Sequence, residues 1–184
     1  GVDTSNYATS LAVFDTAGEV VCAKKRFLPV KPGQLGLRQS DALFHHTTAL
    51  PEMLHELAQE FDLTRIDAVG VSQKPRPAEG SYMPCFLAGW SQASCLAQIL
   101  GVPLHEFSHQ QGHIAASLWS AGRLDLMQVP HLAWHLSGGT TELLRVTPEG
   151  KGSVHAEKIG GTTDISAGQL IDRTGKLLGL PFPS

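Results

Sequence analysis

The sequence has no long apolar run and no leader-like opening. A helix that crosses a bilayer needs roughly 20 consecutive apolar residues, and no stretch of the 184 residues approaches that length. The opening residues, GVDTSNYATS, lack the basic and apolar parts of a signal peptide. We therefore expect a protein without a membrane partner.

Cysteine is scarce and scattered. The three cysteines are Cys22, Cys85 and Cys95, which gives an odd count and no short spacing. This pattern provides neither a disulfide framework nor a C-x-x-C metal site. A reducing compartment, the cytoplasm, is the location that such cysteine usage favours.

Positive charge is not in excess either. The chain has 14 Lys and Arg against 17 Asp and Glu, for a net charge of −3. A protein that binds nucleic acid unaided usually carries a basic face, and the run Lys24-Lys25-Arg26 is too short to make one. If RNA is a substrate, partners or a further segment must help to hold it. Nine histidines are the unusual feature of the composition.

Strand and helix patterns alternate through the first 125 residues, which favours an α/β fold. A proline inside the first helical pattern, Pro51, predicts a break there. The expected strands are Val2–Phe14 (with a polar turn inside it), Val20–Val30, Ile66–Val71 and Val102–Phe107, and the expected helices are Asp41–Phe61, Phe86–Leu100 and a segment ending near Trp119.

The pattern then restarts. Strands are expected at His131–Leu136, E-L-L-R-V and Ser153–Ile159, with a turn at PEGKG and a helix from about Asp164 to Leu178. We interpret residues 1–125 as a first actin-like lobe and residues 126–184 as the beginning of a second, apparently truncated lobe. The fold expected is the α/β, ribonuclease H-like fold of actin-type ATPases.

Each half opens with a hairpin that has small polar residues at its tip. The tips carry Asp3, Thr4 and Ser5 in the first half and S-G-G-T-T, residues 137–141, in the second. Two such hairpins can cradle the phosphates of a nucleotide with their backbone N–H groups. Turn formation alone explains one hairpin better, but two hairpins in matching positions favour a phosphate site.

The stretch VPLHEFSHQQGHIAASLW holds two overlapping histidine pairs. H-E-x-x-H, at His105, Glu106 and His109, binds zinc in proteases when it lies on one continuous helix. Here a Gly-Val-Pro turn precedes it, and the segment predicts a strand. His109 and His113 instead fall in the next helix, where their spacing puts both imidazoles on one side. Two ligands hold a metal poorly, and the pair alone is explained as well by polar residues at a helix start.

Four segments occur in an order that resembles one family. They are GVDTSNYATSLAVFD, VPLHEFSHQQGHIAA, LSGGTTELL and GGTTDISAGQLIDRTGKLLGLPFPS. Together they resemble the TsaD-type family, formerly called O-sialoglycoprotein endopeptidases or glycoproteases, whose members make threonylcarbamoyladenosine in tRNA next to the anticodon. The resemblance covers nearly the whole chain, and its motifs are specific in combination and weak singly.

The resemblance implies roles for particular residues. His109 and His113 match the family's metal-binding pair, whose third protein ligand is an aspartate beyond this chain's end. The family's S-G-G-H-T phosphate loop matches Ser137, Gly138, Gly139, Thr140 and Thr141, with Leu136 directly before it. Asp172 matches an aspartate that contacts the nucleotide in the family, and Asp3 matches the acidic residue that opens the first hairpin.

The resemblance also implies a reaction and its components. A divalent metal, iron or zinc, and an ATP-derived threonylcarbamoyl-adenylate would meet in the site, and the carbamoyl group would pass to a tRNA adenine. The implied partners are tRNA, an actin-like partner protein and a small ATPase. The metal would act as a Lewis acid, and loop N–H groups would steady negative charge.

Three departures from the family pattern put activity in question. Thr140 replaces the histidine of the phosphate loop, and Gln169 replaces a glutamate in the last helix. The loop SQKPRPAEGSYMP replaces a segment with G-P-G-L, whose glycines allow close backbone approach. These changes indicate a divergent member or fragment, and we expect this chain alone to be inactive.

Other functions compete with this interpretation. A non-catalytic actin-like scaffold would lack the metal histidines, so His109 and His113 argue against it. A sugar or acetate kinase would need a catalytic base and an adenosine motif, and neither is identifiable. A metalloprotease through His105, Glu106 and His109 is the least favoured. The small residues Gly89, Ala93 and Ala97 serve either the core or a homodimer face, and the core is favoured.

Overall fold

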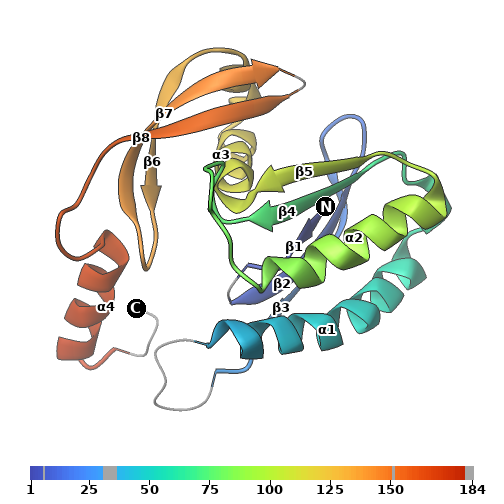
Figure 1. Cartoon of the computed structure of the whole chain (residues 1–184), viewed down its shortest axis with the longest axis horizontal. Coiled ribbons are helices and arrows are strands. Elements are labelled where there is room, and N and C mark those ends of the chain that lie inside the picture. Colours follow the sequence, from blue (N-terminus) through green and yellow to red (C-terminus); the bar gives the residue numbers. More distant parts are fainter. Residues whose placement is uncertain (6, 31–36, 151, 181–184) are drawn as a thin grey trace. The chain divides into compact units, whose positions relative to one another are not determined.

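The alternation of strands and helices expected from the sequence is present in the computed structural model of the chain (Figure 1). The structure describes residues 1–5, 7–30, 37–150 and 152–180. The chain divides into unit 1, residues 1–112, and unit 2, residues 113–184. The lobes expected from the sequence, 1–125 and 126–184, place the whole third helix in the first lobe and stay a prediction.

Unit 1 is built around a five-stranded mixed sheet with the order β3-β2-β1-β4-β5. β1 pairs antiparallel with β2 and parallel with β4, and β5 continues the parallel part. The elements are β1 (Val2–Asp3), β2 (Ala8–Phe14), β3 (Val20–Phe27), α1 (Gln39–Glu60), the 3-10 helix η1 (Leu63–Arg65), β4 (Val69–Lys74), α2 (Phe86–Leu100), β5 (Leu104–Ser108) and the start of α3 (His109–Ser120). This mixed sheet confirms the α/β, actin-like (ribonuclease H-like) fold expected for the first lobe.

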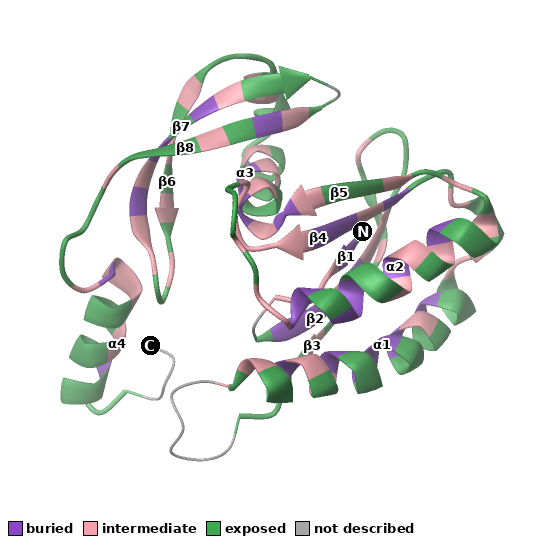
Figure 2. Cartoon of the chain, viewed as in Figure 1, coloured by how far each residue is buried: buried purple, intermediate pink, exposed green. Residues whose placement is uncertain are grey.

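Helices α1 and α2 lie side by side and pack on the sheet of unit 1 (Figure 1). Their buried residues form a stripe toward the sheet, while the opposite side is exposed (Figure 2). This is the amphipathic pattern that drives helix docking. The core cluster joins Val2, Leu11, Ala49, Leu50, Met53, Val69, Val71, Ala88, Ala93 and Ala97. Ala93 and Ala97 are therefore core residues rather than a homodimer face.

The break expected at Pro51 is wrong, because α1 runs unbroken from Gln39 to Glu60 with Pro51 inside it. Proline removes the N–H that would bond to the carbonyl of Thr47. Pro51 and Thr47 are both exposed, so water can solvate that carbonyl. Burial of Leu50, Met53 and Leu57 holds the helix on the sheet.

Unit 2 contains a three-stranded antiparallel sheet with the order β6-β7-β8. The elements are the larger part of α3, the 3-10 helix η2 (Leu124–Gln128), β6 (His131–Leu136), β7 (Thr141–Gly150), β8 (Ser153–Gly161) and α4 (Ala167–Leu177). Its antiparallel pairing repeats that of β1-β2-β3, as the sequence predicted. The core joins Ile114, Leu144, Val146 and Val154, with Leu118, Met127, Ala133 and Ala156 beside them.

Strand β7 continues to Gly150, so the turn expected at PEGKG is shorter than predicted. Pro148 lacks an N–H for a sheet ladder. The pairing of β6 with β7 ends at Val146, however, and beyond that point β7 pairs only with β8. Pro148 therefore lies where one edge of β7 has no neighbouring strand, and its missing N–H breaks no hydrogen bond with β6.

No helix in the described ranges is long and apolar enough to cross a membrane. Cys22, Cys85 and Cys95 are free thiols.

Candidate functional site

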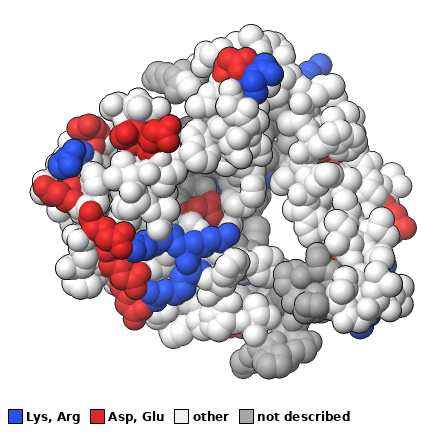
Figure 3. Space-filling model, turned by 180° about the vertical axis from the view of Figure 1, so that it is seen from behind, with Lys and Arg blue, Asp and Glu red and all other residues white. Residues whose placement is uncertain are grey.

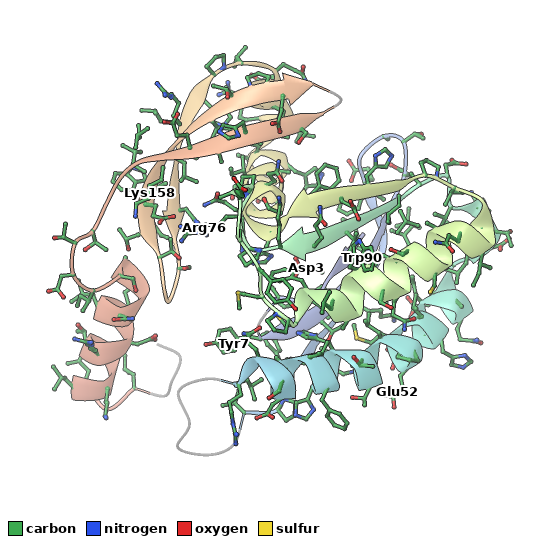
Figure 4. The ribbon with its side chains drawn as sticks, viewed as in Figure 1. Asp3, Tyr7, Glu52, Arg76, Trp90 and Lys158 are labelled. Atoms are coloured by element: carbon green, nitrogen blue, oxygen red, sulfur yellow. The ribbon has the colours of Figure 1, made fainter. Side chains whose placement is uncertain are left out.

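Asp3 at the end of β1 (labelled in Figure 4) and His109 at the start of α3 form a dyad in unit 1. Asp3 Oδ2 lies 2.8 Å from His109 Nδ1, and Asp3 Oδ1 accepts a hydrogen bond from the Ser5 amide at 2.9 Å. Their side chains are 26% and 30% exposed. With an ionised Asp3, His109 donates from Nδ1, so this carboxylate fixes the ring orientation.

The environment of Asp3 favours its ionised form. Burial alone raises the pKa of the carboxyl group, but hydrogen bonds from His109, Ser72 and the Ser5 backbone, together with the charge of His109, lower the pKa below its ordinary value. The predicted first phosphate hairpin therefore has a carboxylate that is already engaged by protein donors.

Thr4 joins the first hairpin to the start of α2. Its hydroxyl donates to the Cys85 carbonyl at 3.0 Å and accepts from the Gly89 amide at 3.1 Å. Thr4 is fully buried, and an added Cβ on Gly89 would lie 2.7 Å from Thr4 Oγ1. A phosphate role for Asp3, Thr4 and Ser5 stays a prediction, since two of these side chains bind protein groups.

The H-E-x-x-H residues do not share a helix. His105 and Glu106 lie on strand β5, and His109 is the first residue of α3. Glu106 accepts a hydrogen bond from the indole of Trp90, which extends from α2 toward the parallel strands (Figure 4). The strand assignment expected from the sequence is confirmed, and it removes the helical geometry that a zinc protease of this motif needs.

His109 and His113 both lie on α3, four residues apart. Within unit 2, the rings of His113 and His135 have centroids 5.8 Å apart with an interplanar angle of 40°. His135 lies on β6, two residues before Ser137 of the S-G-G-T-T loop. No group of three or more His, Cys, Asp or Glu residues is arranged to hold a metal in the described part of the chain.

The S-G-G-T-T loop is the tight turn between β6 and β7. Ser137 N donates to the Thr140 carbonyl at 2.8 Å, and Gly139 N lies 3.3 Å from Ser137 Oγ. An added Cβ on Gly138 or Gly139 would meet no atom within 4 Å. Contacts within the chain therefore do not require glycine at these two positions. The backbone there is open to close approach by a ligand.

The start of α4 holds this loop in place. Ser166 Oγ donates to the Gly138 carbonyl at 2.7 Å, and Ala167 N donates to Thr141 Oγ1 at 2.6 Å. An added Cβ on Gly168 would lie 2.6 Å from the Ser137 carbonyl oxygen. Sequence reasoning missed Ser166 and Gly168, although Ser before a helix is a recognisable N-cap signal.

The remaining predicted nucleotide residues flank the loop. Leu136 ends β6 and is 58% exposed. Asp172 is half-buried on α4, four residues after Gly168. Residues at this spacing share a helix face, so Asp172 is one turn beyond the glycine that touches the loop.

Comparisons with known proteins point to one family. Residues 30–184 match the family model described as TsaD, tRNA N6-adenosine threonylcarbamoyltransferase. Curated proteins of that name from Aromatoleum aromaticum and Ralstonia pickettii are 31% and 32% identical over all of this chain. The matches cover 51% and 50% of those proteins, so the chain spans about half the length of these relatives.

Solved structures give a weaker likeness. The protein called YeaZ from Pseudomonas aeruginosa matches 91% of this chain and 66% of its own, at 15% identity and a TM-score of 0.47.

Proposed function

The chain belongs to the tRNA N6-adenosine threonylcarbamoyltransferase family, and from this premise we propose that it carries metal- and nucleotide-binding residues for threonylcarbamoyl transfer to a tRNA adenosine. The substrate is a threonylcarbamoyl-adenylate derived from ATP. The chain acts with tRNA and with further proteins of the same synthesis, and the location is the cytoplasm.

The dyad of Asp3 and His109 is the observation that carries the proposal. Histidine ligands of metals usually donate their second ring nitrogen to a carboxylate, which sets the tautomer and raises ligand basicity. Asp3 engages Nδ1 of His109 at 2.8 Å, so Nε2 is the nitrogen that a metal would take. His109 and His113 would hold a divalent iron or zinc ion, and when bound it supplies Lewis acidity for substrate oxygens.

The open glycines of the loop support the nucleotide part of the proposal. Gly138 and Gly139 leave space within 4 Å of an added Cβ, so a phosphate group can approach the backbone of the turn closely. The start of α4 lies against the same loop through Ser166 and Gly168. The positive end of the α4 dipole favours a negative phosphate group beside the loop.

The proposed transfer needs no nucleophile from the protein. The exocyclic amine of the tRNA adenine attacks the carbamoyl carbon, a C–N bond forms, and the C–O bond to the adenylate phosphate breaks. AMP leaves with the electron pair of that bond, and the amine loses one proton. The open backbone at Gly138 and Gly139 receives the phosphate of the leaving AMP, and Asp3 keeps the His109 ring oriented.

The alternative interpretations have less support. A protease through H-E-x-x-H needs Glu106 as a general base, and Glu106 instead accepts a hydrogen bond from Trp90. A non-catalytic scaffold has no need for a carboxylate-oriented histidine. Metal binding separates the scaffold from the transferase, because only the transferase depends on His109 and His113.

The proposal is tested by nucleotide binding. We expect calorimetry to detect AMP binding to the chain in the presence of Zn²⁺, with Gly139→Val weakening it at least about tenfold by blocking the loop. Exposed Ser91 on α2 provides the matched control, Ser91→Ala, which should bind like the wild type. Equal affinity of Gly139→Val and the wild type would overturn the role of the loop.

Transfer itself is measured with the complete gene product, threonylcarbamoyl-adenylate and unmodified tRNA. We expect labelled threonylcarbamoyl in the tRNA, lost in His109→Ala and His113→Ala. We expect the 184-residue chain alone to give no transfer. Full transfer activity in both histidine variants would contradict the metal assignment.

A further inference from the structure

We propose that unit 1 carries a site for unpaired nucleotides of RNA. Tyr7 and Tyr82 stack on the bases, and the cations of Lys74 and Arg76 contact the phosphates. The inference rests on the proposed function, in which tRNA is the substrate, and it names residues of the chain that hold this RNA. None of the four belongs to the predicted metal or adenylate residues.

The two tyrosines are the observation behind the inference. They are the only tyrosines in the sequence, and both are exposed on connecting segments of unit 1. Tyr7, directly before β2, is 52% exposed and lies at the tip of the first hairpin (Figure 4). Tyr82, between β4 and α2, is 62% exposed. Exposed aromatic rings on which unpaired bases stack are a common feature of proteins that bind single-stranded nucleic acid.

A small core brings the two tyrosine segments together. Leu28 and Phe86 are buried in this core, and Met83, the residue after Tyr82, packs against it. The Leu28 amide donates to the carbonyl of Tyr7 at 2.9 Å. Both tyrosines therefore flank one cluster, although they are 75 residues apart in the chain.

The same core contacts the dyad. The rings of Phe86 and His109 have centroids 6.0 Å apart, and the Thr4 hydroxyl next to Asp3 donates to the carbonyl of Cys85 in this core at 3.0 Å. RNA held by the tyrosines consequently lies in the same region of unit 1 as the proposed metal ligand His109.

The loop between β4 and α2 adds positive charge to this surface. Lys74 ends β4, and Arg76 follows it by two residues (Figure 4, Arg76 labelled). The Arg76 amide donates to Ser81 Oγ at 3.0 Å, which brings the arginine backbone beside the residue that precedes Tyr82. The Lys74 ammonium forms no ion pair with any described residue. Cations next to stacking rings are the combination that single-stranded RNA requires, because every nucleotide carries a negative phosphate.

Hydrogen bonds tie this loop to the rest of unit 1. The Pro75 carbonyl accepts from the Gln110 amide in the first turn of α3 at 3.0 Å, and the Ser81 amide donates to the Ala78 carbonyl at 3.3 Å. Proline also fixes its own φ. A loop that is ordered before binding loses less conformational freedom when the ligand arrives.

RNA binding by the whole chain tests the inference. The probe is a labelled RNA hairpin with an unmodified anticodon loop, and fluorescence anisotropy measures its affinity. We expect Tyr7→Ala and Tyr82→Ala each to weaken binding at least about fivefold, the effect of losing one stacked base. Tyr82→Phe should bind like the wild type, because the ring rather than the hydroxyl stacks. Circular dichroism reports whether each variant is folded.

Salt dependence tests the cations. Each phosphate contact contributes about 0.7 to the slope of log affinity against log salt concentration for a single strand. We expect Lys74→Gln and Arg76→Gln each to reduce the slope by about this amount. Slopes unchanged in both variants would overturn the phosphate contacts.

Phe14→Ala is the matched control for the tyrosines. Phe14 is 50% exposed and ends β2, about 20 Å from the end that Tyr7 precedes, given the rise of a strand. We expect this variant to bind the RNA like the wild type. Unchanged affinity in folded Tyr7→Ala and Tyr82→Ala would overturn the inference.

AMP distinguishes RNA from the adenylate as the source of the base. AMP binding that weakens in Tyr82→Ala would assign the ring to the adenylate and overturn the RNA site. AMP binding lost in Gly139→Val, with RNA binding unchanged in both tyrosine variants, removes the RNA site and keeps the proposed function. Tyrosine-dependent RNA binding, with no transfer by the complete gene product, keeps the RNA site and overturns the proposed function.

Discussion

At the residue scale, Gly139 in the S-G-G-T-T loop and Gly168 beside it differ in how much space surrounds them. An added Cβ on Gly139 meets open space, whereas on Gly168 it would lie 2.6 Å from the Ser137 carbonyl oxygen and the Gly138 Cα. These are backbone atoms of the loop, and they cannot rotate away as a side chain can. Gly168 therefore fixes how closely α4 approaches the loop, and Gly139 leaves the loop accessible.

This contrast predicts the effects of two matched substitutions. Gly168→Ala should lower the free energy of unfolding by about 1–3 kcal/mol, as overpacking does, although alanine ordinarily favours a helix by up to about 1 kcal/mol. Gly139→Ala should leave stability nearly unchanged. Urea unfolding of both variants measures this. A Gly168→Ala chain as stable as the wild type would contradict the close packing of α4 on the loop.

His46 is a buried titratable residue whose protonation affects stability. It is fully buried on α1, and its Nδ1 lies 2.8 Å from Thr9 Oγ1. Burial lowers its pKa, and this outweighs the opposing effects of the Ser5 backbone and the Asp3 charge. The unfolded chain, with a histidine pKa of about 6.5, therefore takes up the proton first as pH falls.

The stability of the chain should consequently decrease as pH falls below about 6.5, the range in which the unfolded state binds the extra proton. His46→Gln should show a smaller decrease than the wild type. His55→Gln is the control, because His55 is exposed on the same helix. The measurement is denaturant unfolding across this pH range, and identical pH slopes for His46→Gln and the wild type would exclude His46 as the cause.

At the element scale, the first hairpin and α2 are joined by one buried threonine. Thr4 bonds both the Cys85 carbonyl and the Gly89 amide. Gly89 has no Cβ, which lets the helix approach the hairpin. The packing of α2 on β1 thus depends on a glycine that helix propensity alone would replace by alanine.

Gly89→Ala should for this reason be destabilising by about 1–3 kcal/mol, the usual result of overpacking. Ser91→Ala on the exposed side of α2 is the control and should change stability little. Thermal melting of both variants is the measurement. A higher melting temperature for Gly89→Ala would mean that Thr4 rearranges without cost.

At the scale of the whole molecule, charge limits what the chain can bind alone. Lys24 and Arg26 of β3 pair with Glu60, Glu52 and Glu56 of α1. Lys and Arg side chains lie beside Asp and Glu on the face drawn in Figure 3. These cations are compensated, and the net charge is −3.

Binding of tRNA by the chain alone should accordingly be weak. We expect a dissociation constant above about 10 μM at physiological salt, the range of non-specific electrostatic binding. Filter binding with unmodified tRNA measures this, beside the full-length relative from Ralstonia pickettii. Tight binding by the chain alone would contradict the expectation that other segments or partners hold the tRNA.

The sequence determined the order of strands and helices, because apolar periodicity and Gly and Pro positions reflect local backbone preferences. It also separated the strand at His105 from the helix at His109. The sequence did not predict that α1 is continuous, because burial of Leu50, Met53 and Leu57 overrides the local effect of Pro51.

Only the tertiary structure decided which distant side chains meet. Asp3 and His109 are 106 residues apart in the chain, and the sheet brings them to 2.8 Å. His113 meets His135, and Gly168 meets the Ser137 loop, through packing around the core of unit 2. Contacts between remote segments depend on how the faces of several elements pack together, and no local pattern of residues encodes them.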